Sequence, residues 1–95
     1  MQIIEPHSQS GWITAEIAGR WVQAKVYDKP SEFGINGGRV SKCCVGKTSM
    51  HDPDQDFFPQ MDFSYDRELD FNNLPSGVLD VILAELEALP SAYFD

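Results

Sequence analysis

The alternation of apolar and polar side chains predicts a β-hairpin in the first third of the chain. Residues 12–18 and 21–27 both alternate with a period of two, which is typical of half-buried strands. Gly19 and Arg20 between them favour a tight turn. The apolar positions expected to face the core are Ile13, Ala15, Ile17, Val22, Ala24 and Val26.

Two further strands are predicted after this hairpin. The loop 28–38 contains Asn36-Gly37, the strongest turn signal in the chain, and residues 39–45 then form a shorter strand. Residues 57–66 show the clearest alternation, and Pro59 near their start favours an edge strand or a bulge. The apolar side of this last strand is Phe57, Met61, Phe63 and Tyr65, and its polar side is Gln60, Asp62, Ser64 and Asp66.

The period changes to three and four near the C-terminus, which predicts an amphipathic helix over about residues 76–89. Ser76 is the expected N-cap and Pro90 the expected end of the helix. The apolar stripe consists of Val78, Leu79, Ile82, Leu86 and Leu89. The acidic side chains expected to point away from it are Asp80, Glu85 and Glu87.

Together these elements predict an α+β fold, in which an antiparallel sheet of four to five strands carries one C-terminal amphipathic helix on its apolar face. The sheet is expected over about residues 11–71. A chain of 95 residues is too short to enclose two separate cores, so we expect a single domain over residues 1–95.

Charge is distributed unevenly along the chain, whose formal net charge is -8. Residues 1–50 carry four acidic and six basic side chains, whereas residues 51–95 carry eleven acidic side chains and one basic one, Arg67. An acidic surface repels nucleic acid and attracts basic partners, so direct nucleic-acid binding is not expected. A surface that only keeps the protein soluble is the alternative explanation.

No apolar run approaches the roughly 20 residues that cross a bilayer. The first residues also lack the basic and apolar segments of a secretory signal. We therefore expect a cytoplasmic protein that does not associate with membranes.

The residues that could carry metal or catalytic chemistry do not form a complete motif. Asp52, Asp54 and Asp56 are spaced like the first half of a calcium loop, but Phe57 and Phe63 occupy the positions where glycine and glutamate are needed.

The two cysteines, Cys43 and Cys44, are adjacent, so on a strand they point to opposite faces and cannot easily form a disulfide with each other. Only His7 and His51 are available as further soft ligands, which does not suggest a zinc site. We predict no metal, no cofactor and no catalytic residue.

Three segments carry a resemblance to a known group of proteins. Residues 21–28 read WVQAKVYD, residues 31–42 read SEFGINGGRVSK, and residues 64–70 read SYDRELD. Over about residues 11–71 the chain resembles a family of small uncharacterised bacterial and phage proteins, in which an AKVYD-type strand, a GINGGR-type turn and a YDRG-type element follow one another. It departs from that pattern at Glu68, where glycine is usual, and in its cysteine pair and its acidic segment 47–56.

This resemblance implies a compact β-rich fold and a phage or mobile-element setting, but no reaction. In size and charge, small acidic proteins from such elements resemble inhibitors of bacterial defence systems, including anti-CRISPR proteins and DNA mimics. The expected partner is a host protein with a basic surface, such as a CRISPR effector complex that handles nucleic acid. The acidic residues expected to bind it are Asp52, Asp54, Asp56, Asp62, Asp66, Glu68 and Asp70.

Two other functions remain open from the residues alone. The chain could be a soluble domain without an inhibitory role, which could form a homodimer through a face that carries Trp12 and Trp21. A small enzyme that uses neighbouring carboxylates such as Asp62 and Asp66 is a weaker alternative, because exposed carboxylates keep ordinary pKa values and make poor acids at neutral pH.

Overall fold

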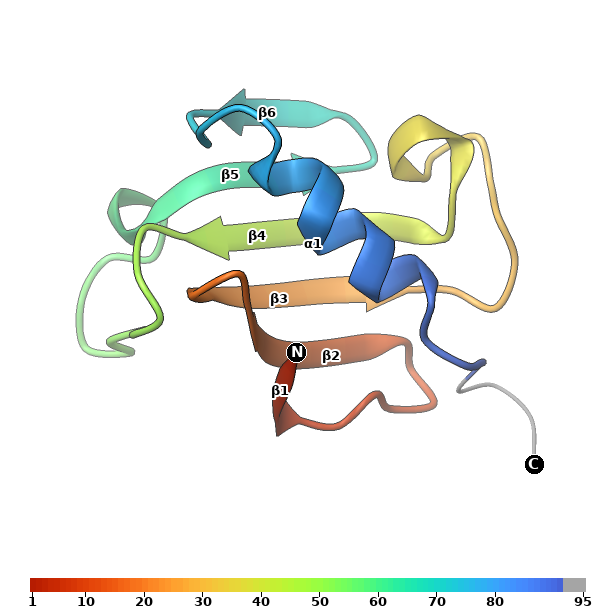
Figure 1. Cartoon of the computed structure of the whole chain (residues 1–95), viewed down its shortest axis with the longest axis horizontal. Coiled ribbons are helices and arrows are strands. Elements are labelled where there is room, and N and C mark those ends of the chain that lie inside the picture. Colours follow the sequence, from red (N-terminus) through yellow and green to blue (C-terminus); the bar gives the residue numbers. More distant parts are fainter. Residues whose placement is uncertain (92–95) are drawn as a thin grey trace.

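A computed structural model describes residues 1–91 of the chain. It contains one six-stranded sheet whose strands lie side by side in sequence order, each antiparallel to the next (Figure 1). The strands are β1 (Gln2–Glu5), β2 (Trp12–Ile17), β3 (Arg20–Val26), β4 (Val40–Gly46), β5 (Met61–Asp66) and β6 (Leu69–Asn72). One α-helix, α1 (Val78–Glu87), and two short 3₁₀ turns, η1 (Ile35–Gly37) and η2 (Phe58–Gln60), complete the fold.

The predicted β2–β3 hairpin is present, with its turn one residue earlier than expected. Ala18 and Gly19 form this turn with φ values of 54° and 73°. Two consecutive positive φ angles are typical of two-residue hairpin turns, because their twist matches that of the flanking strands. The six apolar positions predicted to face the core are all buried.

The loop between β3 and β4 turns where the sequence indicates. Asn36 and Gly37 have φ values of 56° and 72°, the left-handed region that asparagine and glycine tolerate best. Gly34 has a different reason to be glycine, because a Cβ atom there would collide with the carbonyl oxygen of Gly38. The loop therefore depends both on left-handed backbone and on close backbone packing.

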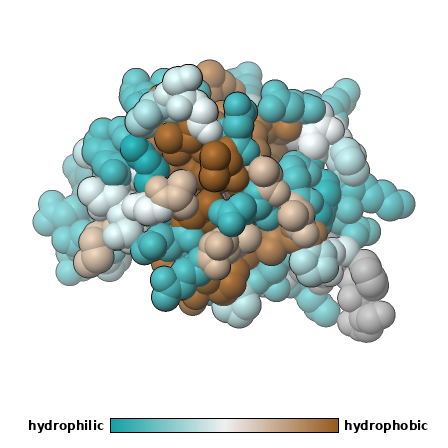
Figure 2. Space-filling view, viewed as in Figure 1, coloured by the Kyte–Doolittle hydropathy of each residue, from teal (hydrophilic) through white to brown (hydrophobic). Residues whose placement is uncertain are grey.

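Helix α1 lies across one face of the sheet, as predicted, and closes the hydrophobic core (Figure 1). Ile82, Leu83 and Leu86 of the helix are buried together with apolar side chains of the strands, Phe63 among them. Seen from the helix side, apolar surface gathers over the middle of the molecule between hydrophilic groups (Figure 2). Val81 on the helix is 53% exposed.

The ends of the helix differ from the sequence prediction. The N-cap is Gly77, with a φ of 84° and no capping side chain, rather than Ser76. Glu87 does not point into solvent: its carboxylate accepts hydrogen bonds from backbone N–H groups at the start of β4. The helix thus ends in a polar contact with the sheet.

The sheet has six strands rather than four to five, because β1 and β6 were not predicted. Both are four-residue edge strands, and all four residues of β1 are exposed. Without a buried side, β1 has no apolar alternation by which a strand is recognised.

Strand β5 begins at Met61, not at Phe57, because the residues around Pro59 form the turn η2. It lies inside the sheet between β4 and β6, so the edge alternative suggested by Pro59 is wrong. A register shift between Val45 and Gly46 opposite this segment agrees with the bulge alternative. Among residues 1–91, no helix is both long and apolar enough to cross a bilayer.

Candidate functional site

The side of the sheet opposite α1, called the open face below, carries a row of small and polar side chains. Cross-strand pairing places Thr14 opposite Gln23, Gln23 opposite Cys44 and Cys44 opposite Ser64. Because directly paired residues point to the same side of a sheet, these four side chains form one line across β2, β3, β4 and β5.

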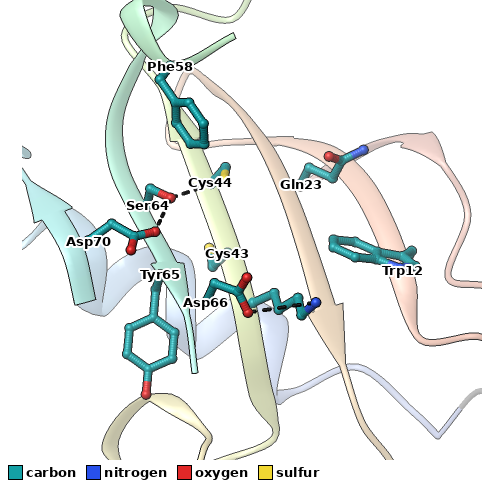
Figure 3. A pocket seen from close by; sticks show the side chains of 10 residues that line it. Trp12, Gln23, Cys43, Cys44, Phe58, Ser64, Tyr65, Asp66 and Asp70 are labelled. Carbon is teal, nitrogen blue, oxygen red and sulfur yellow. Dashed lines mark hydrogen bonds and ion pairs between the residues drawn. The ribbon is translucent and has the colours of Figure 1, made fainter. Parts of the chain in front are cut away.

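Gln23, Cys44 and Ser64 of this row line a concavity whose volume is about 210 Å³, and Figure 3 shows their side chains. Cys44 and Ser64 are small, whereas Phe58 beside them and Trp12 on the far side of Gln23 are large, so a hollow remains between the two aromatic rings. Trp12 is 37% exposed and Phe58 is 58% exposed. The open face therefore presents a shallow aromatic-walled pocket to solvent.

Two carboxylates and one ammonium complete the pocket. Asp70 accepts a hydrogen bond from the Ser64 hydroxyl at 2.9 Å, and Asp66 forms an ion pair with Lys42 at 3.7 Å. Both contacts are drawn as dashed lines in Figure 3. The two carboxylates lie at the β5–β6 end of the pocket, whereas the Lys25 ammonium lies over the Trp12 ring at the other end, so the negative charge is concentrated at the β5–β6 end.

The cysteines lie on opposite sides of the sheet, as predicted. Cys43 is buried in the core and Cys44 is half-buried in the pocket. Burial raises the pKa of the Cys43 thiol. Burial also raises the pKa of Cys44, assisted by the Asp70 and Asp66 carboxylates and opposed by the Ser64 hydroxyl. Since the thiolate is the reactive form, neither cysteine is activated as a nucleophile.

Asp62 does not present the free charge that the sequence led us to expect. Its carboxylate receives hydrogen bonds from Arg20 at 2.9 Å and from Lys47 at 2.7 Å, and its side chain is only 17% exposed. The hydrogen bonds from Lys47 and Arg20 lower the pKa of Asp62. This aspartate joins β5 to β3 and to the end of β4, and it is poorly placed to bind a partner.

Asp52, Asp54 and Asp56 all lie exposed on the loop between β4 and η2. The Gln60 side chain organises this loop, because its amide oxygen accepts the Asp52 N–H and its amide nitrogen donates to the carbonyl oxygens of Asp52 and Asp56. Asp52 also accepts the backbone N–H of Asp54 at 2.9 Å. Hydrogen bonds within the loop therefore hold its backbone in place, while all three acidic residues stay exposed.

Aromatic packing anchors the same loop to the open face. The His51 ring stacks on Trp21 with a centroid distance of 4.1 Å, and Phe57 meets the Trp21 ring edge-on at 6.0 Å. Trp21 is buried by these contacts. Of the two tryptophans proposed for a dimer face, only Trp12 is thus exposed.

Asp66, Glu68 and Asp70 lie exposed at the turn between β5 and β6. Arg67 in this turn has a φ of 63°, and its N–H donates to the Ser41 carbonyl oxygen at 2.9 Å. Two of the three acids, Asp66 and Asp70, line the pocket on the open face.

Apart from Asp62, the predicted acidic residues therefore fall into two groups, at opposite ends of β5. The loop group consists of Asp52, Asp54 and Asp56, and the turn group consists of Asp66, Glu68 and Asp70. Strand β5 separates them by roughly 13 Å between positions 62 and 66 alone, taking 3.3 Å per residue.

Several pocket residues were missed by sequence reasoning, notably Gln23, Phe58 and Ser64. The alternation had placed Gln23 and Ser64 on the polar sides of their strands. Alternation alone does not give the pairing register, which places Gln23 and Ser64 in one row with Cys44. The sequential order of the strands determines only which strands are neighbours, so no signal in the sequence aligns these residues.

Residues 1–91 contain no group of three or more histidine, cysteine, aspartate or glutamate side chains arranged to hold a metal ion.

A family model described as Domain of unknown function (DUF7678) matches residues 10–87. The chain belongs to this family. No curated protein and no solved structure matches it.

The DUF7678 domain runs from just before β2 to the last residue of α1. It includes the whole pocket and both acidic groups. Strand β1 lies outside the matched segment and contributes no side chain to the pocket lining.

Proposed function

We propose that this DUF7678 protein is a non-enzymatic inhibitor that binds a basic surface of a host complex that processes nucleic acid. It would block that surface by occlusion, as anti-CRISPR proteins do. The observation that carries the proposal is the exposure of six of the seven predicted acidic residues, in the loop group and the turn group, with only Asp66 joined to a base in a surface ion pair.

Charge supports a protein partner over nucleic acid. The chain carries a net charge of -8, and eleven of its fifteen acidic residues lie in residues 51–95. Phosphate groups would be repelled by both acidic groups, whereas a groove of arginine and lysine side chains would be attracted. An occupant of such a groove competes with nucleic acid for the same cations.

The ion pairs of Asp62 remove this residue from the set of acidic residues proposed to bind the partner. Its charge is compensated by Arg20 and Lys47, so it contributes to the fold and not to the partner interface. The proposed interface consists of the loop group and the turn group, with the open face between them.

The test is affinity capture from bacterial lysate at low and high salt, followed by an activity assay of the captured complex. The main variant combines Asp66→Lys with Glu68→Lys in the turn group. The control combines Asp28→Lys with Glu32→Lys, two exposed acids outside both groups that give the same change in net charge. We expect a nucleic-acid-processing complex that is released by salt, inhibited by the wild type and the control, and not bound by the main variant.

Equal binding by the two variants would refute the role of the turn group, and capture of no such complex would refute inhibition.

Self-association through the open face is the alternative supported by the exposure of Trp12 and Phe58. Sedimentation at increasing protein concentration would then reveal a dimer that forms without a partner. Because two copies of charge -8 repel each other, that dimer should strengthen as salt is added.

A further inference from the structure

The pocket on the open face has the size of a single amino-acid side chain. Its volume of about 210 Å³ lies below the roughly 300–1,000 Å³ typical of pockets for drug-sized molecules. A nucleotide or an organic cofactor would therefore fit poorly. One long side chain that extends from a partner protein suits this volume better.

The charge of the pocket selects a cation. Asp66 and Asp70 contribute two carboxylates, and Lys42 contributes one ammonium that lies 3.7 Å from Asp66. Asp70 is held in place by the Ser64 hydroxyl. The raised pKa of the Cys44 thiol, caused first by burial and then by Asp70 and Asp66, agrees with a negative potential at the centre of the pocket.

The aromatic walls select the same kind of group. Cations bind favourably over aromatic faces within about 6 Å of the ring centroid. The Lys25 ammonium already lies 5.9 Å from the centroid of the Trp12 ring, so a cation from a partner would reach this ring only by displacing Lys25. Phe58 offers a second exposed ring at the other side of the pocket.

We infer that this pocket receives one arginine side chain of the basic partner. A planar guanidinium stacks on an aromatic ring and donates to two carboxylates at once, which the compact ammonium of lysine does less well. This inference rests on the proposed function, because the arginine belongs to the proposed basic surface. It adds an anchoring position at which the shape of the pocket, and not only the charge of the protein, determines which partner is bound.

The test uses the purified full chain and short capped peptides, without any host partner. Gly-Arg-Gly, Gly-Lys-Gly and the neutral Gly-citrulline-Gly are titrated while amide and indole NMR shifts are followed. We expect the arginine peptide to shift the signals of Trp12, Cys44 and Asp70, and to bind more tightly than the lysine peptide. The citrulline peptide should bind roughly tenfold more weakly or not at all, since it lacks the charge.

Variants separate the pocket from the general acidic charge. Asp70→Asn and, independently, Asp66→Asn should each weaken arginine binding roughly tenfold. Glu32→Gln also removes one exposed negative charge, but Glu32 lies outside the pocket and outside both acidic groups, so this variant should bind like the wild type. A circular dichroism spectrum of each variant verifies that it is folded.

Equal shifts with citrulline and arginine, or equal weakening by Glu32→Gln and both pocket variants, would overturn the inference. Absence of arginine binding to the wild type would overturn it as well. These results are independent of the lysate capture. If the arginine peptide does not bind but a complex is captured, the arginine pocket is refuted and the proposed inhibitory function stands. If the peptide binds but no complex is captured, the pocket is supported and the inhibitory function is refuted.

Discussion

Arg39 and Glu87 bind each other's backbone in a reciprocal contact between the start of β4 and the end of α1. The Glu87 carboxylate accepts the backbone N–H of Arg39 at 2.9 Å and 3.1 Å. The Arg39 guanidinium in turn donates to the carbonyl oxygens of Glu87 at 3.0 Å and Leu89 at 2.6 Å. The last carbonyl groups of a helix lack partners within the helix, so Arg39 stabilises its C-terminus while Glu87 stabilises the strand.

Replacing Glu87 with alanine should destabilise the protein by about 1–3 kcal/mol, because backbone N–H groups at the start of β4 lose their partner. Urea unfolding followed by circular dichroism measures this change. Glu85→Ala is the matched control, since Glu85 is on the same helix and pairs with the N-terminal amine at 3.2 Å in a partly exposed position. The control should change stability by no more than about 0.5 kcal/mol. Equal effects would mean that the Glu87 contact contributes nothing specific.

The ion pairs of Asp62 should make stability depend on pH. Hydrogen bonds from Lys47 and Arg20 lower its pKa below the ordinary 3.8, so the folded protein binds this proton less readily than the unfolded chain. The stabilisation is therefore present at neutral pH and is lost as the pH falls through 3.8 and then through the lowered pKa.

Thermal unfolding of wild type and Asp62→Asn across this acidic range provides the measurement. The wild type should be the more stable protein at pH 7, and the difference should shrink with acidification. The exposed Asp56→Asn change is the control and should leave the transition temperature at pH 7 unaltered. A difference for Asp62→Asn that stays constant with pH would contradict the assignment.

The stacking of His51 on Trp21 should be visible by fluorescence. In a Trp12→Phe background Trp21 is the single tryptophan of the chain, and its ring is covered by His51 and Phe57. Adding His51→Ala should expose the indole and shift its emission to longer wavelength. The Met50→Ala change, at a neighbouring residue that is 77% exposed, should not. An unchanged spectrum after His51→Ala would show that other groups shield Trp21.

The two thiols should differ in accessibility to a disulfide reagent. Cys43 is buried in the core, and Cys44 is half-buried in the pocket with a raised pKa. In the folded protein at neutral pH we expect slow modification of one thiol, which Cys44→Ser abolishes. Two thiols should react in urea. Rapid reaction of both in the folded state would contradict the burial of Cys43.

Most of the sheet was predictable from alternation, because one side of each central strand is buried. Val22 and Ala24 illustrate this, since both are fully buried and alternate with polar residues. Strand β1 was not predictable in this way. Its Ile3 and Ile4 are about half exposed, so pairing with β2 and not burial makes it a strand.

The candidate site was harder to predict than the fold, because it depends on register and on local pairing. The seven acids could be identified as polar and exposed, but only a three-dimensional contact reveals that Asp62 is bound by Arg20 from a strand 42 residues earlier. The pocket likewise arises from a difference in side-chain size between Cys44 and its neighbours, which becomes a hollow only when their strands pair.

The sequential order of the six strands has a kinetic consequence. Each strand pairs with the next one along the chain, so every loop that must close joins consecutive strands, which favours fast folding. The largest of these closures joins β4 to β5 across residues 47–60, the segment that carries the loop group. Shortening this acidic segment would accelerate folding, so its length is a feature that folding speed alone does not explain.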